Sequence, residues 1–359
     1  MPKKPILTWK SLGDGERDEL LQQYLGGKSA EWLIENNDLA MRPETLQRRL
    51  QELSAARQIP KVIVGRGDFE KHWELYCKLI GRDPRKSIPT GKKKSGKSRK
   101  VIVLCDLHGN PDKELIERVI GEKADLYVMA GDVFDAFAFS KFEKDKHIPI
   151  ADELANVRAT YEHIIKETGA QIVQEQGNHD ARAHKYFAQR IEPEFMSLVQ
   201  WNLLELAAIN LPGVNTSKNL YGFTTGGGRK VDGVLENCWI AHVGEDALIA
   251  HGEVARKGEG RTVDALVEWI DRWKKPLSWI EPRLVIQAHV HRASMAWAQG
   301  GHQIRVEGGF SGEIPPLQYA MNYGTTVYSP PVLGYTVFRQ ENRAGKWSTD
   351  LSSVQFILC

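Results

Sequence analysis

Aspartate, histidine and asparagine side chains gather in five short segments of this chain, and each segment follows an apolar run. The segments span residues 106–108, 131–135, 177–180, 250–252 and 288–291. In open α/β sheets, ligands bind at the carboxyl ends of the strands. Five apolar runs that each deliver such groups at their ends therefore predict one shared site.

The residue types in these segments suit divalent metal ions. Two such ions about 3.5–4 Å apart need a bridging carboxylate and a mixture of oxygen and nitrogen ligands. An Asp-x-His or His-x-His alternation on an extended segment directs both side chains to one face, so a short segment supplies two ligands. The four cysteines (Cys77, Cys105, Cys238 and Cys359) have no paired spacing. We therefore expect two divalent ions, manganese first, with iron, zinc, nickel and magnesium as alternatives, rather than a thiolate zinc site.

Strands and helices alternate from residue 101 onward. Apolar runs predict strands at residues 101–104, 126–130, 172–174 and 284–287. Amphipathic runs predict helices at residues 112–121, 151–168 and 262–273. Shorter β-rich runs follow at residues 303–306, 325–328, 335–339 and 355–358, and residues 220–234 predict a glycine-rich loop or hairpin. We expect an α/β domain at residues 101–359, in which two central sheets form a sandwich with helices outside.

Residues 1–85 predict a small all-α domain. Pro43 is placed to begin the third of three short helices, and a tight turn precedes it. The pattern is similar to a helix-turn-helix, whose last helix would expose Gln47, Arg48 and Arg49 to phosphates and bases. Three-helix units of this size also serve in protein docking or oligomerisation, so a homo-oligomer is an open alternative.

Residues 86–100 are dense in Lys, Ser and Gly and predict a flexible basic linker. Residues 91–98 match a P-loop letter for letter, but no strand precedes them and a strand follows, so we do not expect nucleotide binding there. Residues 1–100 hold 22 Lys and Arg against 13 Asp and Glu, whereas residues 101–359 hold 26 against 33. A basic front half indicates a polyanionic partner, nucleic acid with DNA favoured, and a solvated basic face is the alternative.

The chain carries no sign of a membrane or secretory protein. Its first residues are followed by no apolar leader, and no apolar run approaches the roughly 18 residues that span a bilayer. The scattered cysteines favour a reducing compartment. These features predict a cytoplasmic protein with no membrane partner.

Taken in order, the blocks Asp-x-His, Gly-Asp-x-x-Asp, Gly-Asn-His-Asp, His-Gly and His-x-His resemble the signature of the calcineurin-like metallophosphoesterases across residues 101–292. The resemblance implies the two-sheet fold of that family and a binuclear metal site. Matched by position, the ligands of one ion would be Asp106, His108 and His291, those of the other Asn178, His251 and His289, and Asp132 would bridge both.

The same resemblance implies roles in catalysis. His179 matches the catalytic histidine that protonates the leaving oxygen, and Asp180 is placed to orient it. Asp135 is expected behind the ligands or in a structural role. The attacking group would be a hydroxide held by the metal ions. His184 and Asn110 lie near these blocks in the sequence and are further candidates to line the site.

The likeness also bears on the substrate. Protein Ser/Thr phosphatases of this family carry Arg and Gly where this chain has Ala136 and Phe137, and Glu where it has Asp180. Gly-Asn-His-Asp with a final His-x-His is more similar to the phosphodiesterase and nuclease branches, and residues 134–142 resemble phage- or prophage-borne members. We expect a nucleic-acid phosphodiesterase. One alternative is a small-molecule or cyclic-nucleotide diesterase whose N-terminal helices serve docking or dimerisation, and another is a non-catalytic adaptor.

Overall fold

The computed structural model describes residue 9 and residues 12–25, 28–37, 39–56, 73–91, 96–140, 148–191, 202–216, 230–231, 234–237, 240–252, 255–273, 281–313 and 330–359. The chain divides into two compact units, one of Met1–Asp68 with Phe187–Gln200 and one of Phe69–Tyr186 with Trp201–Cys359. Of the helices within these described ranges, none is long and apolar enough to cross a membrane.

Three helices characterise the N-terminal unit: α1 (Asp14–Leu25), α2 (Ala30–Asn36) and α3 (Pro43–Ala56). The hydroxyl of Ser29 caps α2 by accepting a hydrogen bond from the Trp32 amide at 3.2 Å. Each helix contributes buried leucines to one small core, among them Leu21, Leu33 and Leu46. The all-α prediction for this region is therefore confirmed.

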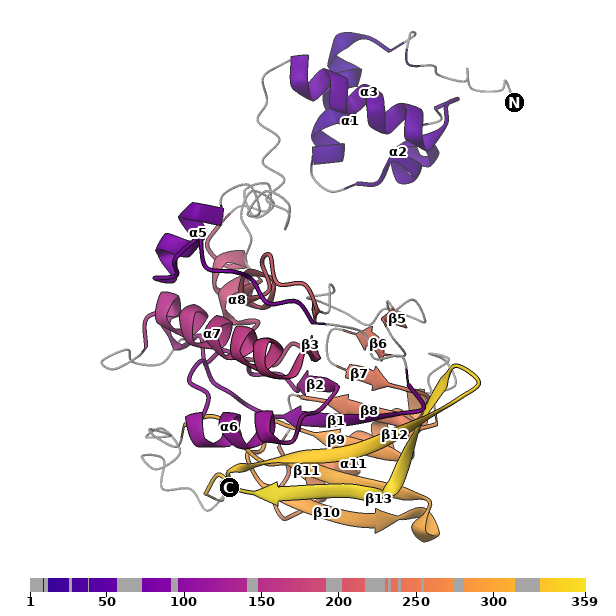
Figure 1. Cartoon of the computed structure of the whole chain (residues 1–359). Coiled ribbons are helices and arrows are strands. Elements are labelled where there is room, and N and C mark those ends of the chain that lie inside the picture. The colour runs from indigo at the N-terminus through magenta and orange to yellow at the C-terminus, as the bar shows by residue number, and fades with distance from the viewer. Residues whose placement is uncertain are drawn as a thin grey trace. The chain divides into compact units, whose positions relative to one another are not determined.

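The first sheet of the larger unit has the strand order β13-β12-β1-β2-β3-β4 (Figure 1). Its strands are β1 (Ser98–Leu104), β2 (Leu126–Met129), β3 (Gln171–Gln174), β4 (Val214–Thr216), β12 (Gly334–Arg343) and β13 (Lys346–Leu358). Strands β1 to β4 are parallel, and β12 pairs antiparallel with β1. The carboxyl ends of β1, β2 and β3 therefore meet at one edge.

The second sheet has the order β10-β11-β9-β8-β7-β6-β5. Its strands are β5 (Lys230–Val231), β6 (Val234–Asn237), β7 (Ile240–Val243), β8 (Ala247–Ala250), β9 (Leu284–Gln287), β10 (Ala293–Ala298) and β11 (Gln303–Gly308). Strands β8 and β9 are parallel, so their carboxyl ends also share an edge.

The two sheets pack face to face, with helices on their outer faces (Figure 1). Along β1, Val101 and Val103 point into the apolar layer shared with the second sheet, whereas Ile102 and Leu104 pack with α6 (Lys113–Gly121) and α7 (Ile150–Thr168). On the other side, α11 (Arg261–Trp273) covers β7, β8 and β9 through an apolar face. The predicted two-sheet sandwich flanked by helices is confirmed.

The segment after the N-terminal helices packs differently from our expectation. Tyr76, from α5 (Trp73–Leu79), and Ile80 lie in the core of α6, α7 and the first sheet. Arg82 forms an ion pair with Glu162 of α7 at 2.8 Å, and the Gly91 amide donates to Pro212. An apolar face and a charged partner on α7 thus hold residues 73–91 on the larger unit. The contacts divide the chain between residues 68 and 69, whereas the sequence interpretation placed the division at residue 85.

Four short elements complete the described structure: η2 (Phe137–Phe139), α8 (Arg182–Ala188), α10 (Leu203–Ala207) and η3 (Gln299–Gly301). Strand β1 begins at Ser98, inside the predicted linker. The strand expected at residues 325–328, most of the loop expected at 220–234 and linker residues 92–95 lie outside the described residues.

Candidate metal centre

The expected ligands lie at the carboxyl ends of strands from both sheets, and several hold an unusual backbone conformation. Asp106, His108 and Asp132 have φ angles of 56°, 50° and 43°, and His289 and His291 have φ angles of 78° and 54°. Residues with side chains rarely adopt this left-handed region, and each such residue costs about 1–3 kcal/mol unless its surroundings enforce it. The strained backbone of these loops therefore lowers the stability of the fold, and in return it directs the ligand side chains toward one another.

Two glycines permit the close approach of these loops. A Cβ on Gly131, whose φ is 75°, would lie 2.5 Å from the Cβ of His251, and a Cβ on Gly177 would collide with Asp132. Only glycine provides both the space and the conformation at position 131. The Gly-Asp and Gly-Asn pairs in the sequence thus reflect packing between ligand loops.

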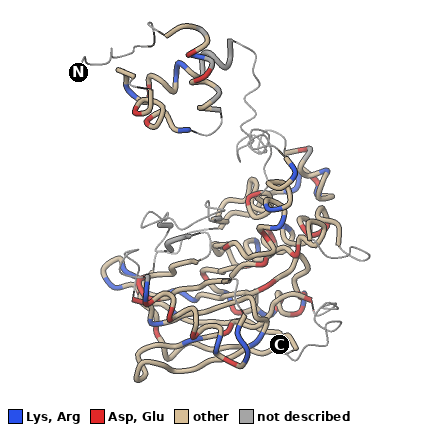
Figure 2. The backbone as a smooth tube through the Cα atoms, turned by 180° about the vertical axis from the view of Figure 1, so that it is seen from behind, with Lys and Arg blue, Asp and Glu red and all other residues tan. Residues whose placement is uncertain are grey.

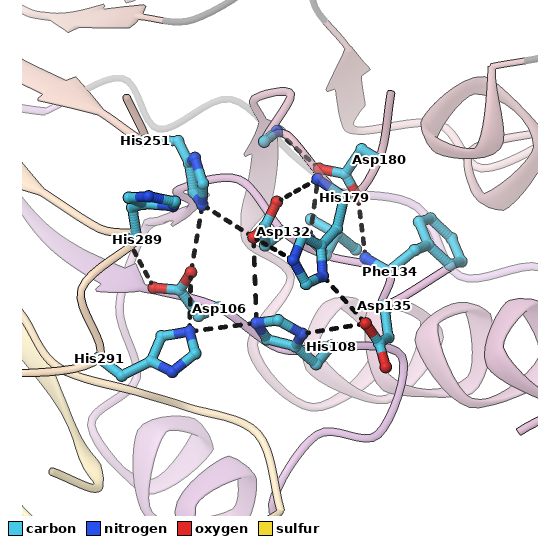
Figure 3. A network of polar contacts seen from close by, with 12 residues as sticks. Asp106, His108, Asp132, Phe134, Asp135, His179, Asp180, His251, His289 and His291 are labelled. Carbon is cyan, nitrogen blue, oxygen red and sulfur yellow. Dashed lines mark hydrogen bonds and ion pairs between the residues drawn. The ribbon is translucent and has the colours of Figure 1, made fainter. Parts of the chain in front are cut away.

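One group of ligand atoms joins β1 to β9. The imidazole Nε2 atoms of His108 and His291 lie 3.2 Å apart, and Asp106 Oδ1 lies 3.6 Å from His291 Nε2 (Figure 3). One ligand atom from each of these residues falls within 4.8 Å of the others. The rings of both histidines pack against Phe310, which is buried and closes this side of the group.

A second group joins β2 to β8 and β9. It consists of Asp132, His251 and His289, again with one ligand atom from each within 4.8 Å of the others. His251 Nε2 lies 3.1 Å from Asp132 Oδ2 and 3.2 Å from Asp106 Oδ1, so it stands between the carboxylates of the two groups. The Nδ1 atom of His251 lies 2.6 Å from the Gly252 carbonyl, which orients the ring and leaves Nε2 for the carboxylates.

A third group contains His108, Asp135 and His179, all from the first sheet. His179 Nδ1 lies 2.9 Å from Asp135 Oδ1, and the His179 amide donates to Asp132 Oδ1 at 2.7 Å. Asp135 is therefore the carboxylate that orients His179, a role that we had expected of Asp180.

Asp180 braces the loops instead. Its oxygens accept hydrogen bonds from the amides of Gly177 at 2.7 Å and Phe134 at 2.8 Å, so it ties the segment after β3 to the segment after β2. Its burial and the nearby Asp132 charge raise its pKa to about 7. The sequence did not reveal this exchange of roles. Asp180 is next to His179 in the chain and Asp135 belongs to the preceding motif, so spacing alone favoured Asp180 as the partner of His179.

Asn178 supplies an observation that bears on metal binding. Its Oδ1 atom is buried and has no hydrogen-bond partner within the part of the chain that the structure describes. A buried acceptor without a donor costs about 1–3 kcal/mol. A cation is a suitable partner for such an oxygen beside carboxylates and imidazoles, so the residues present fit a divalent metal centre.

The charges of the site also fit a cation. Burial would raise the carboxyl pKa of Asp106 and Asp132, but the facing histidines hold both well below their usual range. Burial lowers the pKa of His251, yet Asp132 and Asp106 outweigh it and raise that pKa well above its ordinary value. Burial and the neighbouring His251 lower the pKa of His289 to about 4. Without metal, the two carboxylates thus favour a proton on His251, and a divalent cation would take the place of that proton.

Arg182 is a residue of this site that sequence reasoning missed. It begins α8, and its Nη2 atom lies 2.7 Å from His179 Nε2 while Nη1 donates to Asp135. Its place three residues after His179 was the only available signal. Of the two further candidates, Asn110 donates its amide to Glu313, and His184 lies half-buried on α8.

The predicted nucleic-acid residues lie in the other unit. Gln47, Arg48 and Arg49 are exposed on the first half of α3. Figure 2 shows basic and acidic residues together on these helices. Their contact with nucleic acid stays a prediction, as does the assignment of individual metal ligands.

A family model for calcineurin-like phosphoesterases matches residues 99–293, which is more than half of the chain. The chain therefore belongs to the calcineurin-like phosphoesterase family, whose members use divalent metal ions. The matched residues include all of the expected metal ligands. No curated protein matches this chain.

Several solved structures are similar to this chain at low identity. Vps29 from Entamoeba histolytica, in complex with zinc, is 10% identical, with a TM-score of 0.31 over 72% of this chain and 98% of that chain. A metallophosphoesterase from Sphaerobacter thermophilus is 12% identical, with a TM-score of 0.29 over 72% and 88%. A protein serine/threonine phosphatase from Saccharomyces cerevisiae is 12% identical, with a TM-score of 0.33 over 82% and 89%. Such distant likenesses carry no substrate over to this chain.

Proposed function

We propose that this chain hydrolyses phosphodiester bonds at a centre of two divalent metal ions, manganese first, and that its substrate is nucleic acid. The observation that carries the hydrolytic part is the pair of ligand groups that join the two sheets, together with the unpartnered oxygen of Asn178. The two groups adjoin each other, because Asp106 of one and Asp132 of the other both face His251 Nε2.

The residues would divide the work as follows. Asp106, His108 and His291 would hold one ion, Asn178, His251 and His289 the other, and Asp132 both. Bound ions would activate water and withdraw negative charge from the phosphate. His179, held by Asp135 and by the Asp132 carboxylate through its amide, would meet the leaving oxygen. Phe310, which is buried, packs against the rings of His108 and His291 and would hold them in place.

Two features support a polynucleotide. The exposed arginines of α3 follow a turn, as in a recognition helix. In addition, residues 69–100 hold 11 Lys and Arg against 3 Asp and Glu, so most of the basic excess lies in this stretch rather than in residues 1–68, which hold 11 against 10. Cations of this density favour contacts with a phosphate backbone.

One observation favours the alternative, a small diester or cyclic nucleotide. Lys97 and Lys100 lie at the amino end of β1, and Gly91 packs beside Ala170 at the amino end of β3. The ligands lie at the opposite, carboxyl ends of the same strands. A substrate that reaches the metals would not need these cations, which would then serve solubility or docking.

The test is cleavage of end-labelled single- and double-stranded DNA and RNA by the full chain with Mn²⁺, using His108→Ala as the blank. Cleavage that needs both Mn²⁺ and His108 is the expected result, and the product lengths distinguish an endonuclease from an exonuclease. Intact nucleic acids alongside hydrolysis of bis-p-nitrophenyl phosphate would select the small-diester alternative. No hydrolysis of either substrate would refute the proposal.

A further inference from the structure

The guanidinium of Arg182 is held against the histidine that should meet the leaving group. Its Nη1 atom donates to the Asp135 carbonyl at 2.8 Å and to Asp135 Oδ1 at 3.0 Å, and its Nη2 atom lies 2.7 Å from His179 Nε2. A guanidinium can only donate, so His179 Nε2 is the acceptor in this contact. The hydrogen of this ring then lies on Nδ1, which faces Asp135 at 2.9 Å.

In this arrangement Arg182 can still donate one more hydrogen bond at the site. The Nη2 atom carries two hydrogens, and only one is directed at His179; among the residues that the structure describes, no acceptor takes the other. The Arg182 side chain is 20% exposed, whereas that of His179 is 11% exposed. The cation is therefore fixed by Asp135 on one side and accessible on the other.

The negative charge of the surrounding aspartates explains why a substrate phosphate would need a cationic side chain here. Asp106, Asp132 and Asp135 each belong to one of the three groups of ligand atoms, and a phosphate must approach these carboxylates to reach the metal ions. Bound metals offset part of that negative charge. A planar guanidinium adds directed, charge-assisted hydrogen bonds to an anionic oxygen, which are about twice as strong as neutral ones.

We propose that Arg182 binds an anionic oxygen of the substrate phosphate. The oxygen replaces His179 Nε2 as the acceptor for Nη2–H, while Nη1 stays on Asp135. That exchange frees His179 Nε2 to take up a proton from solvent and to pass it to the leaving oxygen. The inference rests on the proposed phosphoester hydrolysis and adds the side chain that holds the phosphate.

The experiment compares the Mn²⁺-loaded wild type with Arg182→Ala, Arg182→Lys and, as a matched control, Arg343→Ala, whose side chain is exposed on the β12–β13 hairpin. Two quantities are measured: kcat/KM for bis-p-nitrophenyl phosphate, and the affinity for inorganic phosphate by calorimetry. Metal content is determined for each variant, so that a loss of ions is not mistaken for a loss of phosphate binding.

For Arg182→Ala we expect kcat/KM to fall by about 10²–10³-fold, as when an oxyanion donor is removed. Phosphate affinity should fall by about 10–100-fold, the value of a hydrogen bond to a charged group. Added guanidinium chloride should restore part of both. Arg182→Lys should lie between the alanine variant and the wild type, because it keeps the charge but loses the fork. Arg343→Ala should match the wild type.

A variant with full metal content and wild-type phosphate affinity but reduced turnover would overturn the proposal, because Arg182 would then only position Asp135 and His179. Failure of guanidinium to restore either quantity, in a correctly folded alanine variant, would count against it too. If the wild type binds phosphate through Arg182 yet hydrolyses no phosphoester, the proposed function fails and this inference stands.

Discussion

The two sheets contribute different chemistry to the centre. The segments after β1, β2 and β3 carry four aspartates (Asp106, Asp132, Asp135 and Asp180) together with Asn178 and two histidines. The segments after β8 and β9 carry only imidazoles, from His251, His289 and His291. Each of the two groups suited to a metal takes members from both sheets, whereas the group of His108, Asp135 and His179 belongs to the first sheet alone.

This difference between the sheets separates metal binding from proton transfer. A metal ion in either group would join the two sheets of the sandwich, so metal binding and packing of the sheets would be coupled. His179, the proposed proton donor, is in contrast held by residues that follow β2 and β3 of the first sheet: Asp135, the Asp132 oxygen that accepts its amide, and Arg182. Metal binding and proton transfer should therefore respond separately to substitutions.

The largest effect is expected from Asp132→Asn, which alters the residue that faces both sheets. Both ions should lose affinity, and hydrolysis should fall to the background rate, because the bridging charge is removed. Metal content and turnover of bis-p-nitrophenyl phosphate measure the effect. Asp152→Asn, an exposed aspartate in the first turn of α7, is the matched control and should behave as the wild type. Full metal content in Asp132→Asn would contradict the bridging role.

A smaller effect is expected within the first sheet. His179→Asn should keep both metal ions but lose about 10²–10⁴-fold of its rate on diesters with poor leaving groups, the range for a general acid. Nitrophenyl esters should lose less, since their leaving group needs little protonation. An equal loss on both substrate types would rule out the assignment of His179 as the proton donor.

Metal removal should reveal the coupling of the sheets as stability. A ligand at a hundred times its Kd stabilises the folded state by about 2.7 kcal/mol, so chelation should lower the Tm measurably. The pKa of His251 is raised in the metal-free folded state, so protonation of His251 stabilises that state. This stabilisation is fully present below the ordinary histidine pKa of 6.5. It is lost as the pH rises from there through the raised pKa. The gap in Tm between Mn²⁺-loaded and chelated protein should therefore widen from about pH 6 to about pH 8. A gap that narrows over this range would contradict the ion pairs of His251.

The smallest effect is expected outside both sheets. Arg48→Ala with Arg49→Ala on α3 should leave hydrolysis of bis-p-nitrophenyl phosphate unchanged. DNA binding should weaken, and the slope of log affinity against log salt should fall by about 0.9 for each phosphate that the altered helix no longer neutralises. Binding titrations at several salt concentrations measure this. An unchanged slope would assign the helices to docking rather than to nucleic acid.

Much of the fold and of the site could be predicted from the sequence, because the candidate ligands lie in short segments directly after the strands. Each ligand block follows an apolar run, and strands of a parallel sheet bring their carboxyl ends to one edge. The two sheets, the outer helices and the strand ends that meet at the centre could therefore be predicted from alternation and spacing. The blocks contain Asp106, His108, Asp132, His251, His289 and His291, which the family resemblance matched to metal ligands, and the structure gathers their side chains into adjoining groups.

Tertiary structure decided what spacing cannot encode. Asp135 and Asp180 stand in adjacent blocks with the same side chain, and only the folded loops determine that Asp135 faces His179 while Asp180 accepts backbone amides. Arg182 reaches the site because α8 begins directly after the loop, and residues 73–91 pack on the larger unit because Tyr76 enters its core and Arg82 pairs with Glu162. The pairs of Asp135 with His179 and of Arg82 with Glu162 join residues that are remote in sequence, and the contact of Arg182 with His179 depends on the direction in which α8 leaves the loop. The sequence determined which groups are available for chemistry, and the fold decided which of them touch.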